Sequence, residues 1–93
     1  MPDREAVTRF VERFAVGLAD AGMPRMPARV FVALLVTDSG RLTAAELAEQ
    51  LHSSAGGISG AVRYLMQTQL VDRERVPGSR KDHYRVRDDV WHA

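Results

Sequence analysis

Residues 43–84, TAAELAEQLHSSAGGISGAVRYLMQTQLVDRERVPGSRKDHY, decide the fold of this 93-residue chain. They begin with two short helical patterns, the first at 44–51 and the second opening at Ser54. Two segments of alternating polar and apolar residues follow at 70–76 and 83–87, with a Pro-Gly turn between them. Two short helices and then a hairpin predict a winged helix-turn-helix, in which the second helix occupies the recognition position and the hairpin is the wing.

The starts of both helices carry capping signals. Thr43 and Glu46 have the spacing of a capping box, in which each side chain accepts a hydrogen bond from a backbone N–H near the other residue. Ser54 is the better N-cap for the second helix, because three apolar residues then fall on one inward face. These residues are Ile58, Val62 and Leu65.

The residues before this stretch predict two more helices. The first is amphipathic, since its apolar residues recur at a spacing of three and four. These residues are Val7, Phe10, Val11, Phe14 and Leu18. The helix should end near Gly22, because glycine accepts the left-handed cap conformation and Pro24 cannot continue the helix. The second helix covers 28–36, with Pro27 in its first turn, and its nearly continuous apolar character predicts a central position.

The whole pattern predicts a mainly α fold with a small β-hairpin wing, an α+β winged helix-turn-helix. We expect an N-terminal amphipathic helix for dimerisation at 1–23, the winged helix-turn-helix at 24–88, and the start of a C-terminal helix at 89–93. Because Trp91 lacks the partners against which a large aromatic side chain usually packs, we expect a fragment that stops early in that last helix.

Composition excludes several classes of function. The chain has no cysteine, which removes disulfides, thiolate metal sites and thiol redox chemistry and favours the cytoplasm. No apolar run approaches the ~20 residues of a membrane helix, so we expect no membrane partner. The three histidines lack the spacing of a metal site or a catalytic triad, and the glycines at 56–57 lack the lysine of a phosphate-binding loop. We therefore expect neither a cofactor nor an enzyme.

The charge of the chain is unevenly distributed. Residues 1–52 carry six basic and seven acidic residues, whereas residues 53–87 carry seven basic and three acidic ones, a local net charge of +4. A basic zone of this kind suits attraction to a polyanion such as double-stranded DNA, although surfaces without such a partner can carry as much charge. The excess coincides with the predicted motif.

The start of the second helix is rich in small residues. Two serines and two glycines there bring backbone amides to a helix N-terminus, so that a phosphate or base edge can approach closely; a plain N-cap is the alternative. These residues are Ser53, Ser54, Gly56 and Gly57. The glycines of the first turn, and Gly60 one turn later, each cost the helix about 1 kcal/mol relative to alanine, which something should offset. A close crossing of the two helices would also explain Gly60.

Farther along the same helix, Arg63 shares an outward face with Ser59, where base-reading side chains must stand. A guanidinium can bind O6 and N7 of guanine together, an interaction worth about 1–3 kcal/mol of discrimination. A surface salt bridge with Asp72 or Glu74 is the alternative. We expect Tyr64 to pack while its hydroxyl reaches a phosphate.

The wing supplies further candidates. Arg80 and Lys81 lie at its tip, where no core can form, so their charges can meet phosphates or a minor groove or simply keep the turn soluble. Arg73 and Arg75 share one face of their strand and could point toward DNA while the intervening acids face away and pair across the strands. His83 could contact a phosphate or be an ordinary exposed histidine. The full candidate DNA-binding set is Thr43, Ser53, Ser54, Gly56, Gly57, Ser59, Gly60, Arg63, Tyr64, Arg73, Arg75, Ser79, Arg80, Lys81 and His83.

Three pieces of this sequence, taken in order, resemble the MarR family of bacterial regulators, and most closely its GbsR-like branch. They are Ser54 in the turn, the helix Ile58-Ser59-Gly60-Ala61-Val62-Arg63-Tyr64-Leu65, and the wing Pro77-Gly78-Ser79-Arg80-Lys81-Asp82-His83-Tyr84. The resemblance covers residues 26–87. It implies a homodimeric transcriptional regulator that binds a pseudo-palindromic operator, commonly a repressor released by a small-molecule effector. It also implies dimerisation through the N-terminal helix and through C-terminal helices that would follow Ala93.

Two hypotheses of different class remain. The first is a sequence-specific DNA-binding regulator, whose binding should weaken steeply with ionic strength and depend on Arg63, Arg80 and Lys81. The second is a winged-helix module for protein association without DNA binding, which should lose its partner when Phe10 or Phe14 is made polar.

Overall fold

The computed structural model describes residues 4–87, which form four helices and one small sheet. In chain order the elements are α1 (Arg4–Asp20), α2 (Arg25–Val36), β1 (Leu42–Thr43), α3 (Ala44–Leu51), α4 (Ala55–Gln67), β2 (Val71–Arg75) and β3 (Asp82–Val86). The sheet is antiparallel in the order β1-β3-β2. This architecture confirms the predicted fold class. The helix start expected at 89–93 lies outside the described residues.

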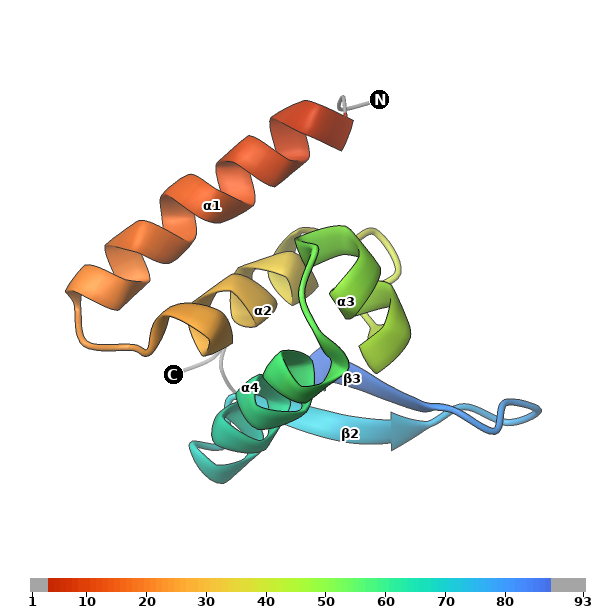
Figure 1. Ribbon diagram of the computed structural model, residues 1–93. Coiled ribbons are helices and arrows are strands. Elements are labelled where there is room, and N and C mark those ends of the chain that lie inside the picture. Colours follow the sequence, from red (N-terminus) through yellow and green to blue (C-terminus); the bar gives the residue numbers. More distant parts are fainter. Residues whose placement is uncertain (1–3, 88–93) are drawn as a thin grey trace.

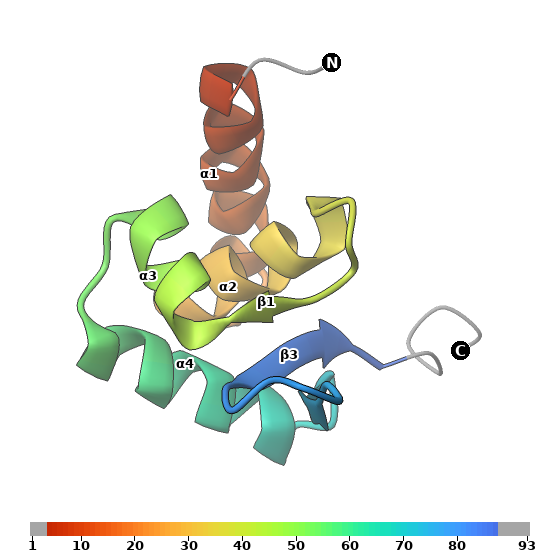
Figure 2. The ribbon, with the colours of Figure 1, turned by 90° about the vertical axis from the view of Figure 1, so that its right-hand side faces the viewer.

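The two ends of the molecule differ in character. α1 runs along one end, α2 packs beneath it, and α4 and the β2–β3 hairpin lie at the opposite end (Figure 1). The view turned by 90° shows the same separation of α1 from α4 and the hairpin (Figure 2). No helix within residues 4–87 is long and apolar enough to cross a membrane.

The core forms around α2, as its apolar sequence predicts. Its buried residues are Pro27, Ala28, Val30, Phe31, Val32, Ala33 and Leu34. α1 packs on one side of α2 and α4 on the other. The inward face predicted for α4 is confirmed, because Ile58, Val62 and Leu65 are at most 3% exposed. Burial of this face turns the opposite face of α4 to solvent.

The apolar face predicted for α1 is divided between two environments. Val11 is 1% exposed and packs in the core, while Val7 and Leu18 are half-buried against it. Phe10 and Phe14 remain 50% and 47% exposed. The helix ends where predicted, with Gly22 at a φ of +111° just beyond it. One apolar stripe therefore attaches α1 to the domain, and a second stripe stays open.

Candidate nucleic-acid interface

The outward face of α4 is a narrow strip of mostly small side chains, with one cationic and one longer neutral side chain. Its exposed residues recur at the helical spacing of three and four. They are Ala55, Gly56, Ser59, Gly60, Arg63 and Gln67. The helix contains no acidic residue, so nothing on this strip repels a phosphate. Gln67 is not among the DNA-binding residues predicted from the sequence. Its position four residues after Arg63 is the sequence signal that places it on the same face.

The two glycines on this strip are not explained by packing. An added Cβ at Gly56 or Gly60 would meet nothing within 4 Å. The suggestion that Gly60 permits a close crossing of α3 and α4 is therefore wrong. Gly57 differs, because its Cβ would lie 2.9 Å from the Oγ of Ser53 and 3.3 Å from the Oγ of Ser54. The local turn accounts for Gly57, whereas Gly56 and Gly60 leave open space above the helix.

Arg63 is the cation of the strip, and it is exposed. The alternative salt bridge with Asp72 or Glu74 is not formed, since both acids pair with other arginines. Within residues 4–87, Arg63 takes part in no ion pair. Tyr64 is half-buried and packs against the core, which confirms the expected packing. The Arg63 guanidinium is thus available to a ligand in front of α4.

The turn before α4 is fixed by caps. Ser54 is the N-cap, and its Oγ accepts a hydrogen bond from the backbone N–H of Gly57 at 3.0 Å. His52 ends α3 in the left-handed conformation at φ 53° and ψ 47°. The N–H of Ser53 donates to the carbonyl of Ala48 at 3.0 Å and closes the end of α3. These local bonds set where the amides at the start of α4 point.

The predicted capping box at the start of α3 is also present. Thr43 Oγ1 accepts from the Glu46 N–H at 3.1 Å, and the Thr43 N–H donates to Glu46 Oε1 at 2.8 Å. That backbone bond lowers the pKa of Glu46 against the opposing effect of burial, and the Thr43 hydroxyl, His83 and Lys81 lower it further. Thr43 is only 7% exposed, and its hydroxyl is engaged in this cap. Of the candidate DNA-binding residues, it is the one that is buried.

The register of the β2–β3 hairpin sorts its charged residues onto two faces. Arg73 lies opposite the buried Tyr84, and Arg75 lies opposite Asp82. Because residues directly opposite each other share a face, the two arginines and Asp82 continue the face that covers the core. We call these three residues the inner wing face. It belongs to the side of the sheet that packs on the helices, and β2 itself contacts α4.

The outer wing face carries the two remaining acids of the hairpin. Glu74 Oε1 lies 2.6 Å from Arg41 Nη1, and Glu74 Oε2 lies 3.2 Å from Arg85 Nε. Asp72 Oδ2 lies 3.9 Å from Arg87 Nε. These pairs confirm the expectation that Asp72 and Glu74 face away from Arg73 and Arg75. The two acids pair with Arg85 in β3 and with Arg87 just after it. The partnership with Arg41 was not predicted, because it depends on how the loop before β1 folds back.

The wing tip presents exposed cations on an ordered turn. Arg80 and Lys81 are exposed. Gly78 takes a φ of +85°, a conformation that suits glycine after proline in a turn. The Oγ of Ser79 accepts from the Lys81 N–H at 3.2 Å, and His83 Nδ1 lies 3.2 Å from the Lys81 carbonyl oxygen. Ser79 and His83 therefore organise the tip from half-buried positions.

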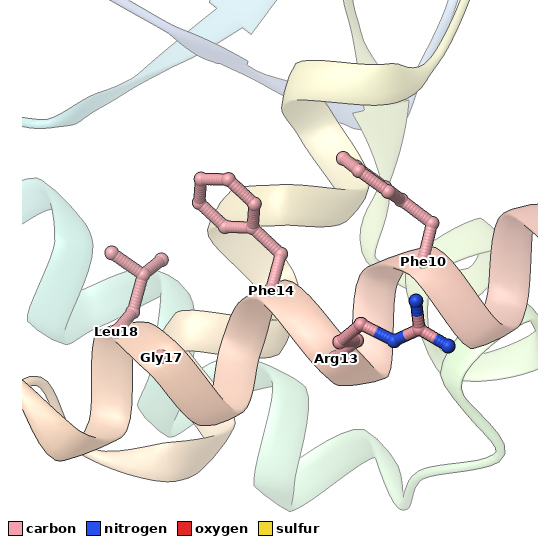
Figure 3. Close-up of a pocket in the computed structure, with 5 residues that line it drawn as sticks. All are labelled: Phe10, Arg13, Phe14, Gly17 and Leu18. Carbon is pink, nitrogen blue, oxygen red and sulfur yellow. The ribbon is translucent and has the colours of Figure 1, made fainter.

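The exposed stripe of α1 lies at the other end of the molecule. The rings of Phe10 and Phe14 have centroids 5.8 Å apart and are tilted by 38°. They project from the same side of the helix as Leu18 and border a shallow apolar hollow of about 370 Å³ (Figure 3). The residues that line it are Phe10, Arg13, Phe14, Gly17 and Leu18. Two half-exposed phenylalanines side by side are typical of an association surface.

A small helix with an open, acid-free face beside a basic hairpin defines a winged helix-turn-helix protein. Comparison with known proteins gives its family. The MarR family matches residues 21–82, and the chain belongs to this family of transcriptional regulators, which are not enzymes. The family that the sequence resembles is thereby confirmed.

Individual relatives agree with this assignment. The chain is 33% identical over 87 residues to the HTH-type transcriptional regulator MmpR5 of Mycobacterium tuberculosis, an alignment that covers 94% of this chain and 53% of that protein. The crystal structure of a transcriptional regulator matches with a TM-score of 0.84 and 33% identity, over 94% of this chain and 59% of that one. Sco3205, a MarR family regulator from Streptomyces coelicolor crystallised with DNA, matches with a TM-score of 0.70 and 26% identity, over 92% and 58% of the two chains. The chain thus spans about half the length of the M. tuberculosis relative.

Proposed function

We propose that this chain is a sequence-specific DNA-binding regulator of transcription that acts in the cytoplasm, with α4 in a major groove and the wing on the flanking backbone. The observation that carries this proposal is the outward strip of α4, which is exposed and contains no acidic residue. Its one cation is Arg63, which forms no ion pair within residues 4–87. The relative Sco3205, whose structure contains DNA, supports it.

The exposed residues suggest a division of labour. Arg63 reads base edges, because it is the one cationic side chain on the strip. Gly56 and Gly60 let the α4 backbone approach the groove wall, since no side chain fills the space above them. The cations of the wing, Arg73, Arg75, Arg80 and Lys81, contact phosphates and fix the register of the protein on the duplex.

We further propose that the regulator binds a pseudo-palindromic operator as a homodimer, with Phe10 and Phe14 in the interface between copies. Their exposure on α1, away from α4, supports this assignment because it leaves both recognition helices free. Repression, release by a small-molecule effector and the GbsR-like branch remain predictions from the resemblance. The protein-association module is the competing function, and the same two phenylalanines support it.

Selection of bound duplexes from a random pool tests the proposal directly. We expect the wild-type chain to enrich one inverted-repeat motif that Arg63→Ala fails to enrich, since loss of a bidentate base contact costs about 1–3 kcal/mol. Arg9→Ala is the matched control, because it removes an exposed arginine from α1. It should enrich the wild-type motif. A folded wild-type chain that enriches nothing above background would favour the association module.

Substitution of Gly60 by alanine should separate stability from binding. Alanine in the middle of a helix makes the folded state more stable than glycine does by about 0.5–1 kcal/mol. The open space at Gly60 accepts the added methyl group. We therefore expect Gly60→Ala to unfold at a higher temperature while it binds the selected duplex more weakly. Circular dichroism melting and fluorescence anisotropy would measure the two effects on one sample. Unchanged or tighter DNA binding would show that Gly60 does not face the groove.

A further inference from the structure

Asp82 stands apart from the other acids of the described hairpin. Asp72 and Glu74 lie on the outer wing face, whereas Asp82 lies on the inner wing face opposite Arg75. It is therefore the acidic side chain that shares a face with Arg73 and Arg75, which the proposed function assigns to DNA phosphates. A carboxylate in that place is unexpected, because it repels the ligand that its neighbours attract.

Asp82 bridges the two arginines through separate oxygens. Its Oδ2 lies 3.7 Å from Arg73 Nε, and its Oδ1 lies 3.5 Å from Arg75 Nε. The two arginine side chains are 55% and 71% exposed, and that of Asp82 is 35% exposed. Both contacts are long for charge-assisted hydrogen bonds, so they are loose ion pairs that water can enter. A competing anion can therefore displace the carboxylate.

The arrangement resembles the way two arginines hold a phosphate. Each oxygen of one anionic group faces a different guanidinium, and both guanidinium groups reach it from the same strand. We propose that Asp82 occupies the place of a backbone phosphate between Arg73 and Arg75 and acts as an internal competitor that limits the affinity of the wing for any duplex. This inference rests on the proposed DNA-binding function and assigns the wing a regulating residue.

The expected consequence concerns specificity more than affinity. Phosphate contacts are the same for every sequence, so a group that weakens them lowers non-specific binding, while base contacts from α4 are made only on the operator. With Asp82 present, the inner wing face carries a net charge of +1 from two arginines and one aspartate. If the negative charge of Asp82 is removed, DNA binding to the same surface should release one more counterion from the duplex.

Asp82→Asn and Asp72→Asn form a matched pair for the test. Each removes one negative charge from the hairpin, but Asp72 lies on the outer wing face and pairs with Arg87. Both variants of the 93-residue chain would be titrated with a labelled random-sequence duplex over a range of salt concentrations. We expect Asp82→Asn to bind about three- to tenfold tighter than wild type, with a salt slope steeper by about 0.9, and Asp72→Asn to stay within about twofold. Melting curves would confirm that both variants fold.

The outcomes separate this inference from the proposed function. Equal affinities of the two variants would show that only net charge matters and would overturn the role of Asp82 alone. Weaker binding by Asp82→Asn would also overturn it, because the carboxylate would then orient the arginines for DNA. If neither wild type nor Asp82→Asn binds any duplex at low salt, the proposed function and the inference both fail.

Discussion

Replacement of Phe14 by aspartate is expected to convert the proposed homodimer into a monomer. Phe14 is 47% exposed beside Phe10, and the two rings provide the apolar surface that a second copy would cover. Aspartate there would have to lose hydration against the apolar side chains of Phe10 and Leu18 when a second copy covers this face, which costs several kcal/mol. We expect the dimer dissociation constant to rise by at least about 100-fold, as measured by analytical ultracentrifugation.

Val16 offers a closely matched control for this substitution. It is 50% exposed and apolar, yet it lies two residues beyond Phe14 and so on nearly the opposite side of α1. Val16→Asp introduces the same charge into the same helix and should remain dimeric. Equal dissociation by the two variants, or a wild-type chain that stays monomeric at all concentrations, would contradict the assignment of this face.

Loss of the dimer should also change DNA binding in a specific way. A monomer still carries α4 and the wing, so a duplex with one half-site should bind Phe14→Asp as it binds wild type. On an inverted repeat the variant should lose the advantage of two linked recognition helices. This contrast distinguishes dimerisation from damage to the DNA-binding surface itself.

Local features of the fold were predictable because their causes lie within a few residues. The caps at Thr43 and Ser54 depend on a side chain and an N–H three residues later, and both formed as predicted. The end of α1 near Gly22 follows from one backbone conformation. The inward face of α4 follows from the spacing of Ile58, Val62 and Leu65, since helical periodicity places them on one side.

The features that the sequence did not predict depend on how separate helices and strands pack together. Periodicity grouped Val11 with Phe10, but the position of α2 decides that the first is buried and the second exposed. The spacing along α4 is compatible with a close helix crossing at Gly60, but no atom of another element lies within 4 Å of a Cβ placed there. The register set by the wing turn places Asp82 opposite Arg75, which the strand sequences alone did not reveal. The individual DNA contacts remain predictions, since each requires the complex.

Arg29 is a further residue that the sequence did not single out. It lies on α2, and its side chain is 21% exposed. Its Nε donates to Glu12 Oε1 on α1 at 2.7 Å, and its Nη2 donates to the carbonyl of Leu51 at 2.7 Å. Leu51 is the last residue of α3, where carbonyls have no partner within the helix. A single guanidinium therefore ties α1 to the turn that leads into α4.

Substitution of Arg29 by methionine is expected to lower the free energy of unfolding by on the order of 3 kcal/mol, because it removes two charge-assisted hydrogen bonds. Glu12→Gln removes only the charge on α1 and should cost about 1 kcal/mol, since Glu12 is 37% exposed and regains water. Urea denaturation would measure both. Arg29→Lys should fall between them, because one ammonium cannot reproduce the planar fork that reaches both acceptors. If Arg29→Met lowers the free energy of unfolding no more than Glu12→Gln does, the hydrogen bond from Arg29 to Leu51 does not stabilise the fold. The apolar packing of α1 against α2 would then be what holds α1 in place.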